Sequence, residues 1–532
     1  MSINNNFIIA LMLSSLIGCA LVPTETAPVG KPKNIILIIG DGMGPQQVGL
    51  LLSYARQAPH GVLADRKTAL DRMMAQGRLG ISMTYTANSL VTDSAASATQ
   101  LATGKAAGAE MLGIDKDGNS QANIIEKARR IGKATGLVSD TRITHATPAA
   151  FAAHQTHRSH ETSIPEDLLA TGADVMLSGG LGYWLPEHSH TDPVLSRQFA
   201  QTFVHSNFKS LRKDPDNLLN KAEQQGYQLV FNNRQLQQAE GKTLGLFANS
   251  EMQNGIAESQ HKHDPQHVQP TLKEMARQAI HILAKNDRGF FLMIESGQID
   301  WAGHRNDTGL LLHEMLRFND MLGAVLDWAA EREDTLVVVT ADHETGGFGF
   351  SYSGVNIPKP HRLPGGAFAD GSLFKPNYNF GNPEVLDRLY GQQRSYHEIF
   401  AEFDALPQLQ QTPASLAGLV NRYTAFAITS AQAATILTTE TNPLYQPGHA
   451  SLGEKIVPKM PVNKAFFVYQ KDNRENLLAQ AVSESQQVVW ATGTHTSTPV
   501  YVFVNGPETS LSAFARILHH TELGQLLAAV WQ

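Results

Sequence analysis

The feature that most constrains this chain is a series of short, continuously apolar segments with helical patterns between them. Six such segments are bounded by turn residues: Asn34–Ile39, Gly136–Ser139, Asp174–Leu177, Phe290–Glu295, Thr335–Thr340 and Val500–Val504. Strands without polar alternation are buried on both faces, as in a parallel sheet. Apolar residues repeat with helical spacing in Leu272–Lys285 and Leu310–Ala330. The sequence therefore predicts an α/β fold in which helices cover both faces of a sheet.

Composition excludes several classes of protein. The 532 residues carry 42 basic and 49 acidic side chains, a formal charge of -7, so no electrostatic footprint for nucleic acid is present. A hydrophobic content of 42% with ordinary Gly and Pro excludes disordered and collagen-like chains. One Cys among 21 His excludes a disulfide framework and a thiolate cluster. Any bound metal must therefore take imidazole and oxygen ligands.

The N-terminal residues 1–19 are typical of an export signal. Phe7–Ile17 is apolar but too short to span a bilayer. The following Gly18-Cys19 resembles a lipoprotein cleavage box, which would make Cys19 a lipidated first residue, but cleavage after Ala20 fits equally. Residues 20–33 are expected to be a linker. We expect an exported protein that is periplasmic, anchored to the outer membrane or secreted.

Polar residues stand at or just after the ends of three of these runs and of a further run, Val488–Thr492, at the position where ligands bind in open α/β sheets. A single residue of this kind is usually a turn former, a helix cap or a solvated side chain. Four runs with the same pattern favour a site. The residues are Asp41 after the first run, Glu295 at the end of the fourth with Asp300 and His304 after it, Asp342 and His343 after the fifth, and His495 after Val488–Thr492.

These residues make two sets of three nitrogen and oxygen ligands. Asp300 and His304 are four residues apart, so one helical turn places both on one face, where His495 completes a set. The other set is Asp41, Asp342 and His343. Three such ligands with an open position suit a catalytic zinc, and two ions about 4 Å apart would clamp a displacement reaction. If Asp41 and His495 share one centre, residues 34–532 form one domain. The irregular stretch at about 346–488 is then a long insertion.

A nucleophile and a cation accompany these ligands. Ser94, in TDSAASAT, is expected at the start of a helix, where free N–H groups favour an anion. The alternative is that Asp93 or Ser94 only caps that helix. Arg158 would offer a planar fork for two phosphate oxygens, or it is an ordinary surface arginine.

Six motifs stand in the order in which they occur in alkaline phosphatases, and the chain resembles the long-insert bacterial branch of that family. They are DGMG, TDSAASAT, HATPAA…HR, ESGQIDWAGH, TADHETGG and GTHT. The resemblance implies a three-layer sandwich with a large mixed, mostly parallel sheet. It also implies hydrolysis of phosphate monoesters over a broad substrate range, by homodimers whose insertion extends over the partner subunit.

The resemblance also assigns roles to residues. Ser94 becomes phosphoserine and Arg158 binds the phosphate. The two ligand sets each hold a Zn²⁺, and a third site of Asp41, Thr147 and Glu295 usually holds Mg²⁺. His145 and Trp301 stand where the enterobacterial branch has Asp and Lys. An imidazole beside the third site suits zinc better than magnesium. Losing the Lys would weaken retention of phosphate.

Two rival functions remain to be weighed. A sulfatase, phosphodiesterase or phosphoglycerate mutase belongs to the same metal-binding superfamily. A sulfatase, however, needs C/S-x-P-x-R, and here Ser94 precedes Ala-Ala-Ser-Ala. A non-catalytic exported protein that binds metal or phosphate would have no need of a nucleophile at this position.

Overall fold

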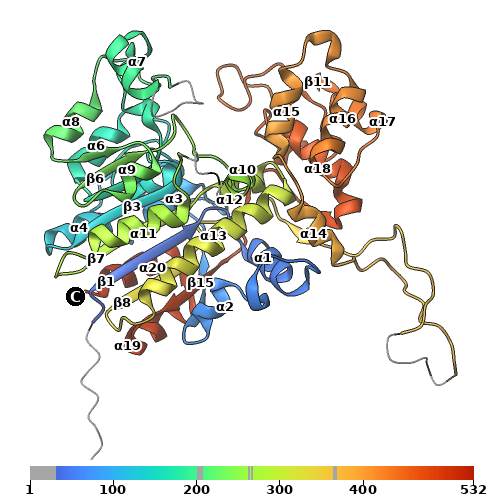
Figure 1. Ribbon diagram of the computed structural model, residues 1–532, viewed down its shortest axis with the longest axis horizontal. Coiled ribbons are helices and arrows are strands. Elements are labelled where there is room, and N and C mark those ends of the chain that lie inside the picture. The colour runs from blue at the N-terminus through green and yellow to red at the C-terminus, as the bar shows by residue number, and fades with distance from the viewer. Residues whose placement is uncertain are drawn as a thin grey trace, which may run out of the picture.

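The computed structural model describes residues 31–200, 208–261, 264, 268–363, 368 and 370–531 (Figure 1). The predicted signal segment 1–19, with Cys19, and residues 20–30 of the predicted linker lie outside the described residues. Among the helices in the described ranges, none combines the length and apolar character needed to cross a membrane.

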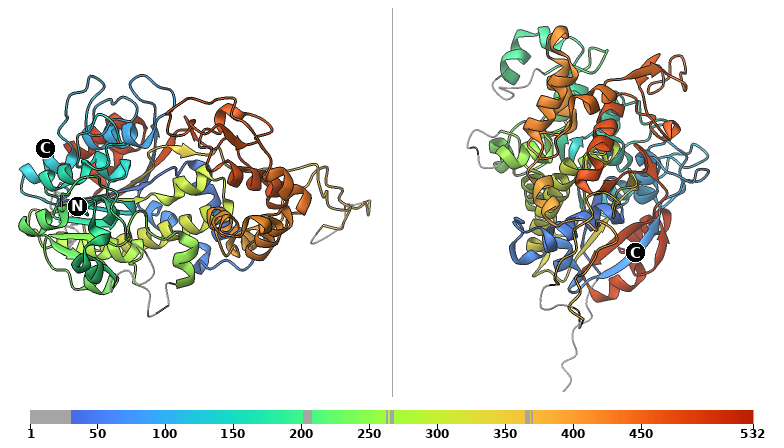
Figure 2. Two further views of the ribbon diagram at one scale, coloured as in Figure 1. Left: turned by 90° about the horizontal axis from the view of Figure 1, so that it is seen from above. Right: turned by 90° about the vertical axis from the view of Figure 1, so that its right-hand side faces the viewer.

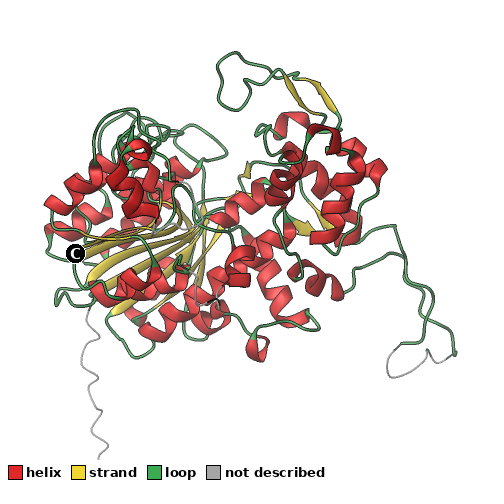
Figure 3. Ribbon diagram, turned by 45° about the horizontal axis from the view of Figure 1, so that its top comes forward, coloured by secondary structure: helices red, strands yellow, loops and turns green. Residues whose placement is uncertain are grey.

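A ten-stranded sheet lies at the centre of the molecule, between helices (Figure 3). Its strand order is β16-β2-β15-β8-β1-β7-β3-β4-β6-β5. Only the pairings of β15 with β2 and β8 are antiparallel within this sheet, so the prediction of a mixed, mostly parallel sheet is confirmed. The strands are β1 (Asn34–Gly40), β2 (Arg78–Met83), β3 (Ala134–Arg142), β4 (Val175–Gly179), β5 (Gln228–Val230), β6 (Thr243–Leu246), β7 (Phe290–Ser296), β8 (Thr335–Thr340), β15 (Val500–Asn505) and β16 (Ile517–His519).

Helices cover both faces, because successive side chains of the buried strands point to opposite sides. Ile36 and Ile38 of β1 enter one apolar core, and Ile35 and Leu37 enter the other. The first core includes side chains of α1 (Pro45–Gln57), α2 (Ala69–Met74), α9 (Asn233–Gln237), α10 (Gly255–His261), α11 (Leu272–Leu283) and α13 (Thr308–Ala329). The second includes side chains of α3 (Ser94–Thr103), α4 (Ile124–Arg130), α5 (Ala146–Ala150), α6 (Ile164–Thr171), α8 (Leu218–Gln224), α19 (Glu508–Leu511) and α20 (His520–Ala529). Further helices are α7 (Pro193–Ala200) and α12 (Gln298–His304).

The predicted insertion is only partly irregular. Between residues 351 and 383 the described residues form an arm without helices or strands, which extends away from the rest of the molecule (Figures 1 and 2). After it comes a helical lobe, contrary to the expectation of an irregular segment. Its helices are short and are separated by turns, so no long apolar period marks them in the sequence. They are α14 (Glu384–Tyr390), α15 (Tyr396–Asp404), α16 (Pro413–Tyr423), α17 (Ser430–Ile436) and α18 (Asn473–Gln486), with a small ribbon of β11 (Thr439–Thr441) and β12 (Ile456–Pro458).

One predicted strand takes a different place. Val488–Thr492 was expected to precede His495 as the other strands precede their ligands, but only β13 (Val488–Val489) is extended, and it pairs with β10 (Gly349–Phe350) outside the main sheet. His495 lies in β14 (His495–Thr496), which pairs with β9 (Glu344–Thr345). A small antiparallel ribbon, not a sheet strand, therefore carries this histidine.

Candidate metal and phosphate site

The register of the three central strands brings their carboxylates to one edge. Ile39 of β1 pairs with Glu295 of β7 and with Thr340 of β8. Asp41 and Asp342 follow within two residues of those pairs, so the three acids meet at the carboxyl end of the sheet. Asp41, Glu295 and Asp342 are fully buried.

The predicted ligand set of Asp41, Asp342 and His343 is assembled in the structure. Ligand atoms of Asp41, Asp342 and His343 all lie within 4.8 Å of one another. The Nε2 atom of His343 is 3.1 Å from Asp342 Oδ2 and 3.5 Å from Asp41 Oδ1. One nitrogen and two carboxylates therefore converge on a space the size of one ion.

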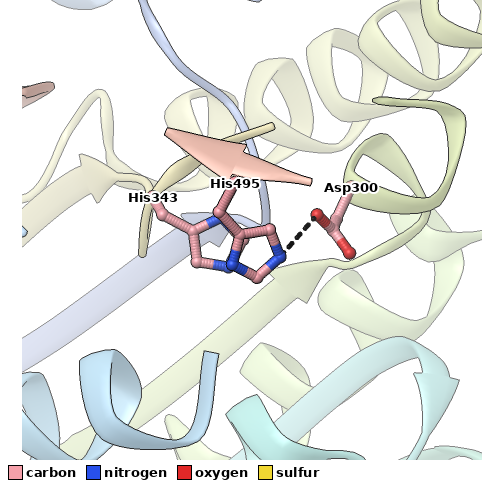
Figure 4. Close-up of side chains that lie close together, drawn as sticks. All are labelled: Asp300, His343 and His495. Atoms are coloured by element: carbon pink, nitrogen blue, oxygen red, sulfur yellow. Dashed lines mark ion pairs between the residues drawn. The ribbon is translucent and has the colours of Figure 1, made fainter. Parts of the chain in front are cut away.

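The second set adjoins the first. Asp300 and His304 share one face of α12, with His304 Nε2 3.2 Å from Asp300 Oδ2. His495 Nε2 lies 3.2 Å from His304 Nε2 and 3.6 Å from Asp300 Oδ1. Its ring stacks on that of His343 at 3.5 Å, so Asp300, His343 and His495 also form a compact group (Figure 4).

A third group lies on the other side of Asp41. Ligand atoms of Asp41, His145 and Glu295 fall within 4.8 Å of one another, and Thr147 Oγ1 donates to Asp41 Oδ2 at 3.2 Å. The hydroxyls of Ser139 and Thr141 donate to Glu295. His145, which the sequence placed only near this site, thus stands among its potential ligands.

Four ligand atoms in these groups are buried without a hydrogen-bond partner among the described residues: Asp41 Oδ1, His145 Nδ1, Glu295 Oε1 and Asp342 Oδ2. Leaving such atoms unpaired costs free energy comparable to a lost hydrogen bond, and more for a charged group. Divalent cations would satisfy all four. Imidazole with carboxylate oxygens suits zinc, and oxygen-rich sets suit magnesium, so the residues fit the implied metals.

The histidines are oriented by their second ring nitrogens. Nδ1 of His304 lies 2.7 Å from the carbonyl oxygen of Gly493, and Nδ1 of His495 lies 2.9 Å from that of Thr92. A carbonyl only accepts, so each Nδ1 carries a proton, and in the neutral ring Nε2 then has the free lone pair. This arrangement orients metal-binding histidines in proteins generally.

Burial and mutual repulsion set the charges of the site. Burial, followed by the negative charges of Asp342 and Asp300, raises the pKa of Asp41 well above its ordinary value. Burial also raises the pKa of Glu295 to about 7. Burial lowers the pKa of His495 and of His145 to about 3, which keeps both rings in the neutral form that binds metals. A bound cation would offset the repulsion among the crowded carboxylates, and the neutral imidazoles are free to bind it.

Ser94 and Arg158 lie beside these groups. Asp93 is the cap of α3, since its carboxylate accepts from Ala95 N and Ala96 N, and Ser94 is the first helical residue. The hydroxyl of Ser94 is 3.1 Å from His343 Nε2. Arg158 is not an ordinary surface arginine: its Nη2 lies 3.2 Å from His145 Nε2, and its side chain is 25% exposed.

Ser94 and Arg158 open onto a cavity of about 400 Å³. Trp301 also lines it, with its ring edge-on to that of His145 at 5.8 Å. Several lining residues were missed in the sequence because no local pattern marks them: they come from loops and a strand end far apart in the chain. They are Glu110, Arg142, Glu251, Arg305, Tyr469, Lys471 and Asp472.

Known proteins show which family this architecture defines. The family model "Alkaline phosphatase" matches residues 32–404. Alkaline phosphatase 4 of Bacillus subtilis is 33% identical over 353 residues, which span 63% of this chain and 68% of that protein. Alkaline phosphatase 3 of the same organism is 35% identical over 339 residues, 61% of this chain and 63% of that protein. The solved cold-active alkaline phosphatase of the psychrophile Shewanella sp. superposes with a TM-score of 0.65 at 25% identity, covering 94% of this chain and all of that one.

The matched family model and these relatives identify the chain as a phosphoric monoester hydrolase. It belongs to the alkaline phosphatase family, which is metal-dependent.

Proposed function

We propose that the chain hydrolyses phosphate monoesters through a phosphoserine on Ser94. The observation that carries this proposal is the position of the Ser94 hydroxyl, at the start of α3, against the Asp41, Asp342 and His343 ligand set and facing the cavity. Ser94 Oγ forms a bond to phosphorus while the alcohol oxygen departs. Water then attacks the same phosphorus and returns the serine.

The chain's own residues would hold the dianion in place. Arg158 presents its planar fork to two phosphate oxygens, and its Nη2 lies 3.2 Å from His145 Nε2. The positive end of α3 favours an anion at Ser94. When bound, divalent cations in the two adjoining sets would neutralise phosphate oxygens and lower the pKa of hydroxyl groups and water beside them.

The central test is Ser94→Ala. Turnover of p-nitrophenyl phosphate is expected to fall by at least about a thousandfold, because the covalent step is lost. Zinc content measured by mass spectrometry should stay at the wild-type level. A variant that keeps its activity would remove Ser94 from the mechanism. Wild-type enzyme that prefers bis(p-nitrophenyl) phosphate would be a diesterase.

For the metals, we propose two Zn²⁺ per subunit and a third ion whose identity depends on His145. The third group offers a nitrogen as well as the oxygens of Asp41, Glu295 and Thr147, and a nitrogen donor favours zinc over magnesium. Metal analysis before and after chelation, with activity followed in parallel, tests this stoichiometry. His145→Asp should make the third site prefer Mg²⁺. An unchanged metal content would contradict the role given to His145.

Trp301 stands where the enterobacterial branch has a lysine. Because this side chain carries no positive charge, we propose that the enzyme retains phosphate more weakly than that branch does. Trp301→Lys should therefore strengthen inhibition by inorganic phosphate. The inhibition constant measures this directly, and an unchanged constant would contradict the hypothesis.

We further propose that the enzyme works as a homodimer whose arm contacts the partner. Exposed aromatic side chains gather at the base of the arm: Phe350, Tyr352, Tyr378 and Phe380. Ser353 and Asn379 pair through two backbone hydrogen bonds of 2.9 Å, so a two-residue Asn-Gly turn can replace residues 354–378. The shortened protein should be a monomer in light scattering. A dimer would exclude the arm as the main contact.

Export to the periplasm, with Cys19 as a possible lipid attachment site, remains the proposed localisation. Metabolic labelling with palmitate in wild-type and Cys19→Ser cells distinguishes an anchored form from a cleaved, unmodified one. Incorporation that depends on Cys19 supports anchoring, and equal labelling rejects it.

A further inference from the structure

One wall of the cavity comes from the insertion, which no motif of the sequence connects with the chemistry. Between the 3-10 turn at Lys464–Phe466 and α18, the chain enters the same cavity that exposes Ser94 and Arg158. Three residues close together in the sequence line it there: Tyr469, Lys471 and Asp472.

This wall is hydrogen-bonded to the segments that carry the metal ligands. The carbonyl oxygen of Phe466 accepts from Thr492 Oγ1 at 2.7 Å and from Gly493 N at 3.2 Å. On the other side, Asn476 Nδ2 donates to the carbonyl oxygen of His304 at 2.7 Å. The wall is therefore held in a fixed position against the His304 and His495 side of the site.

Tyr469 presents both a ring and a hydroxyl there. Its ring packs edge to face against the imidazole of His304, with centroids 4.6 Å apart and planes at 78°. Its hydroxyl makes no hydrogen bond to any group of the described residues. An aromatic surface with an unused donor thus faces the cavity.

Lys471 adds a positive charge that is not committed elsewhere. Its side chain is exposed and forms no ion pair within the described part of the chain. Other cations of the cavity are paired: Arg142 with Glu161 at 2.6 Å, and Arg305 with Glu475 at 3.0 Å. The charge of Lys471 is therefore available to a ligand that reaches the mouth of the cavity.

We propose that Tyr469 and Lys471 form a subsite for the alcohol part of the substrate, which takes an aromatic group and prefers one with a negative charge at its far end. The inference rests on the proposed function: Ser94 Oγ attacks from the side of Asp41, Asp342 and His343. In a displacement clamped by two ions, the departing oxygen would then lie beside the other set, Asp300, His304 and His495. An aromatic leaving group would stack on Tyr469, and its anionic substituent would face Lys471.

The first experiment compares phenyl phosphate with ethyl phosphate in the zinc-loaded enzyme. For each protein, kcat/KM for phenyl phosphate is divided by kcat/KM for ethyl phosphate, and this phenyl-to-ethyl ratio is compared with that of the wild type. The intrinsic reactivity of each ester cancels in the comparison. Tyr469→Leu should lower this ratio about three- to tenfold, the size of an aromatic pair, while Tyr469→Phe should keep it. Tyr445→Leu, at an exposed tyrosine elsewhere in the insertion, is the matched control.

A second readout avoids catalysis. Phenylphosphonate and ethylphosphonate carry the same phosphoryl group and cannot be hydrolysed, so the ratio of their inhibition constants reports contacts of the organic part alone. Tyr469→Leu should change that ratio by the same factor, with wild-type zinc content. Unchanged ratios in both experiments would overturn the subsite. Trp301 is another aromatic residue that lines the cavity, so a lower phenyl-to-ethyl ratio in Trp301→Leu but not in Tyr469→Leu would also overturn it.

Lys471 is tested with 4-carboxyphenyl phosphate against phenyl phosphate. Lys471→Gln should lower that preference about threefold at low salt, and less at high salt, because the pair is near the surface. Lys455→Gln, at an exposed lysine outside the cavity, should leave it unchanged. A preference that survives Lys471→Gln would overturn the charge assignment. Failure of the proposed function looks different: Ser94→Ala would then retain activity on every ester.

Discussion

The sheet and the insertion contribute to the same cavity in different ways. At the sheet, Asp41, Glu295 and Asp342 are fully buried and fixed by strand register. At the insertion, Lys471 is exposed and Tyr469 is half-buried. In the proposed function, the buried part holds what is common to all substrates, the phosphoryl group and its metals. The exposed part meets what differs between them, so the two regions should respond differently to substitution.

The largest difference is expected between two acids of the cavity, Asp300 on α12 and Asp472 beside α18. Asp300→Asn should lower kcat/KM by at least about a thousandfold, since a bound metal supplies several kcal/mol and each tenfold is about 1.4 kcal/mol. Asp472→Asn should cost less than about tenfold. Steady-state kinetics and zinc analysis measure both. Equal losses would remove the distinction between the two regions.

Stability should differ between two ion pairs. Arg317 is 3% exposed and contacts Asp140 at 2.6 Å and Glu314 at 3.2 Å, while Asp140 accepts from Gly297 N just before α12. Arg317→Met leaves buried carboxylates unpaired and should cost about 3–5 kcal/mol. Arg474→Met breaks an insertion pair whose Asp404 is 49% exposed and should cost at most about 1 kcal/mol. Urea unfolding distinguishes them, and similar midpoints would be contrary evidence.

Asn476 tests how firmly the insertion is coupled to the metals. Besides His304 O, its Nδ2 donates to Asn306 Oδ1 at 2.8 Å. Asn476→Ala should weaken zinc binding about 10- to 100-fold, as for other groups that orient metal ligands. Asn421→Ala, which breaks contacts to Ile428 within the lobe, should leave zinc affinity unchanged. Competition with a chelator measures both, and an unaffected Asn476→Ala would mean that the lobe is only a neighbour.

The smallest effect concerns pH and lies far from the insertion. His154 Nε2 is 3.2 Å from Glu126 Oε1, and this hydrogen bond raises the pKa of His154 above 6.5 and lowers that of Glu126 below 4.5. Because its pKa is raised, His154 stabilises the folded state below pH 6.5, and this stabilisation is lost as the pH rises through the folded-state pKa. Because its pKa is lowered, Glu126 stabilises the folded state above pH 4.5, and this stabilisation is lost as the pH falls through the folded-state pKa. His154→Asn should therefore cost about 1 kcal/mol or less between these values and almost nothing at pH 9. Thermal unfolding at both pH values measures it, and a loss that grows toward pH 9 would be the wrong sign.

The sequence predicted the central strands because β1, β7 and β8 are buried on both faces and are continuously apolar. β2 was missed because Arg78, Leu79 and Ile81 are exposed, so the strand lacks an apolar run. β5 and β16 have only three residues each, too few for a recognisable pattern. β6 is fully buried but was also missed, because it has only four residues and a glycine among them. Pattern thus finds the longer strands that are buried on both faces.

The same reasoning applies to the site. Ligands such as Asp41 and Asp342 follow strands immediately, so their position along the chain reveals their position in space. Tyr469 and Lys471 reach the cavity through tertiary hydrogen bonds such as that of Thr492 to Phe466, and no sequence spacing encodes those.

The reversed strand β15 has a consequence for biogenesis. It lies between β8 and β2 and comes five residues after His495. Until that stretch has been synthesised and delivered, the sheet has a gap and the metal centre lacks an imidazole. A chain still being synthesised is therefore inert, and hydrolysis of phosphate esters can begin only once nearly the whole chain is available to fold.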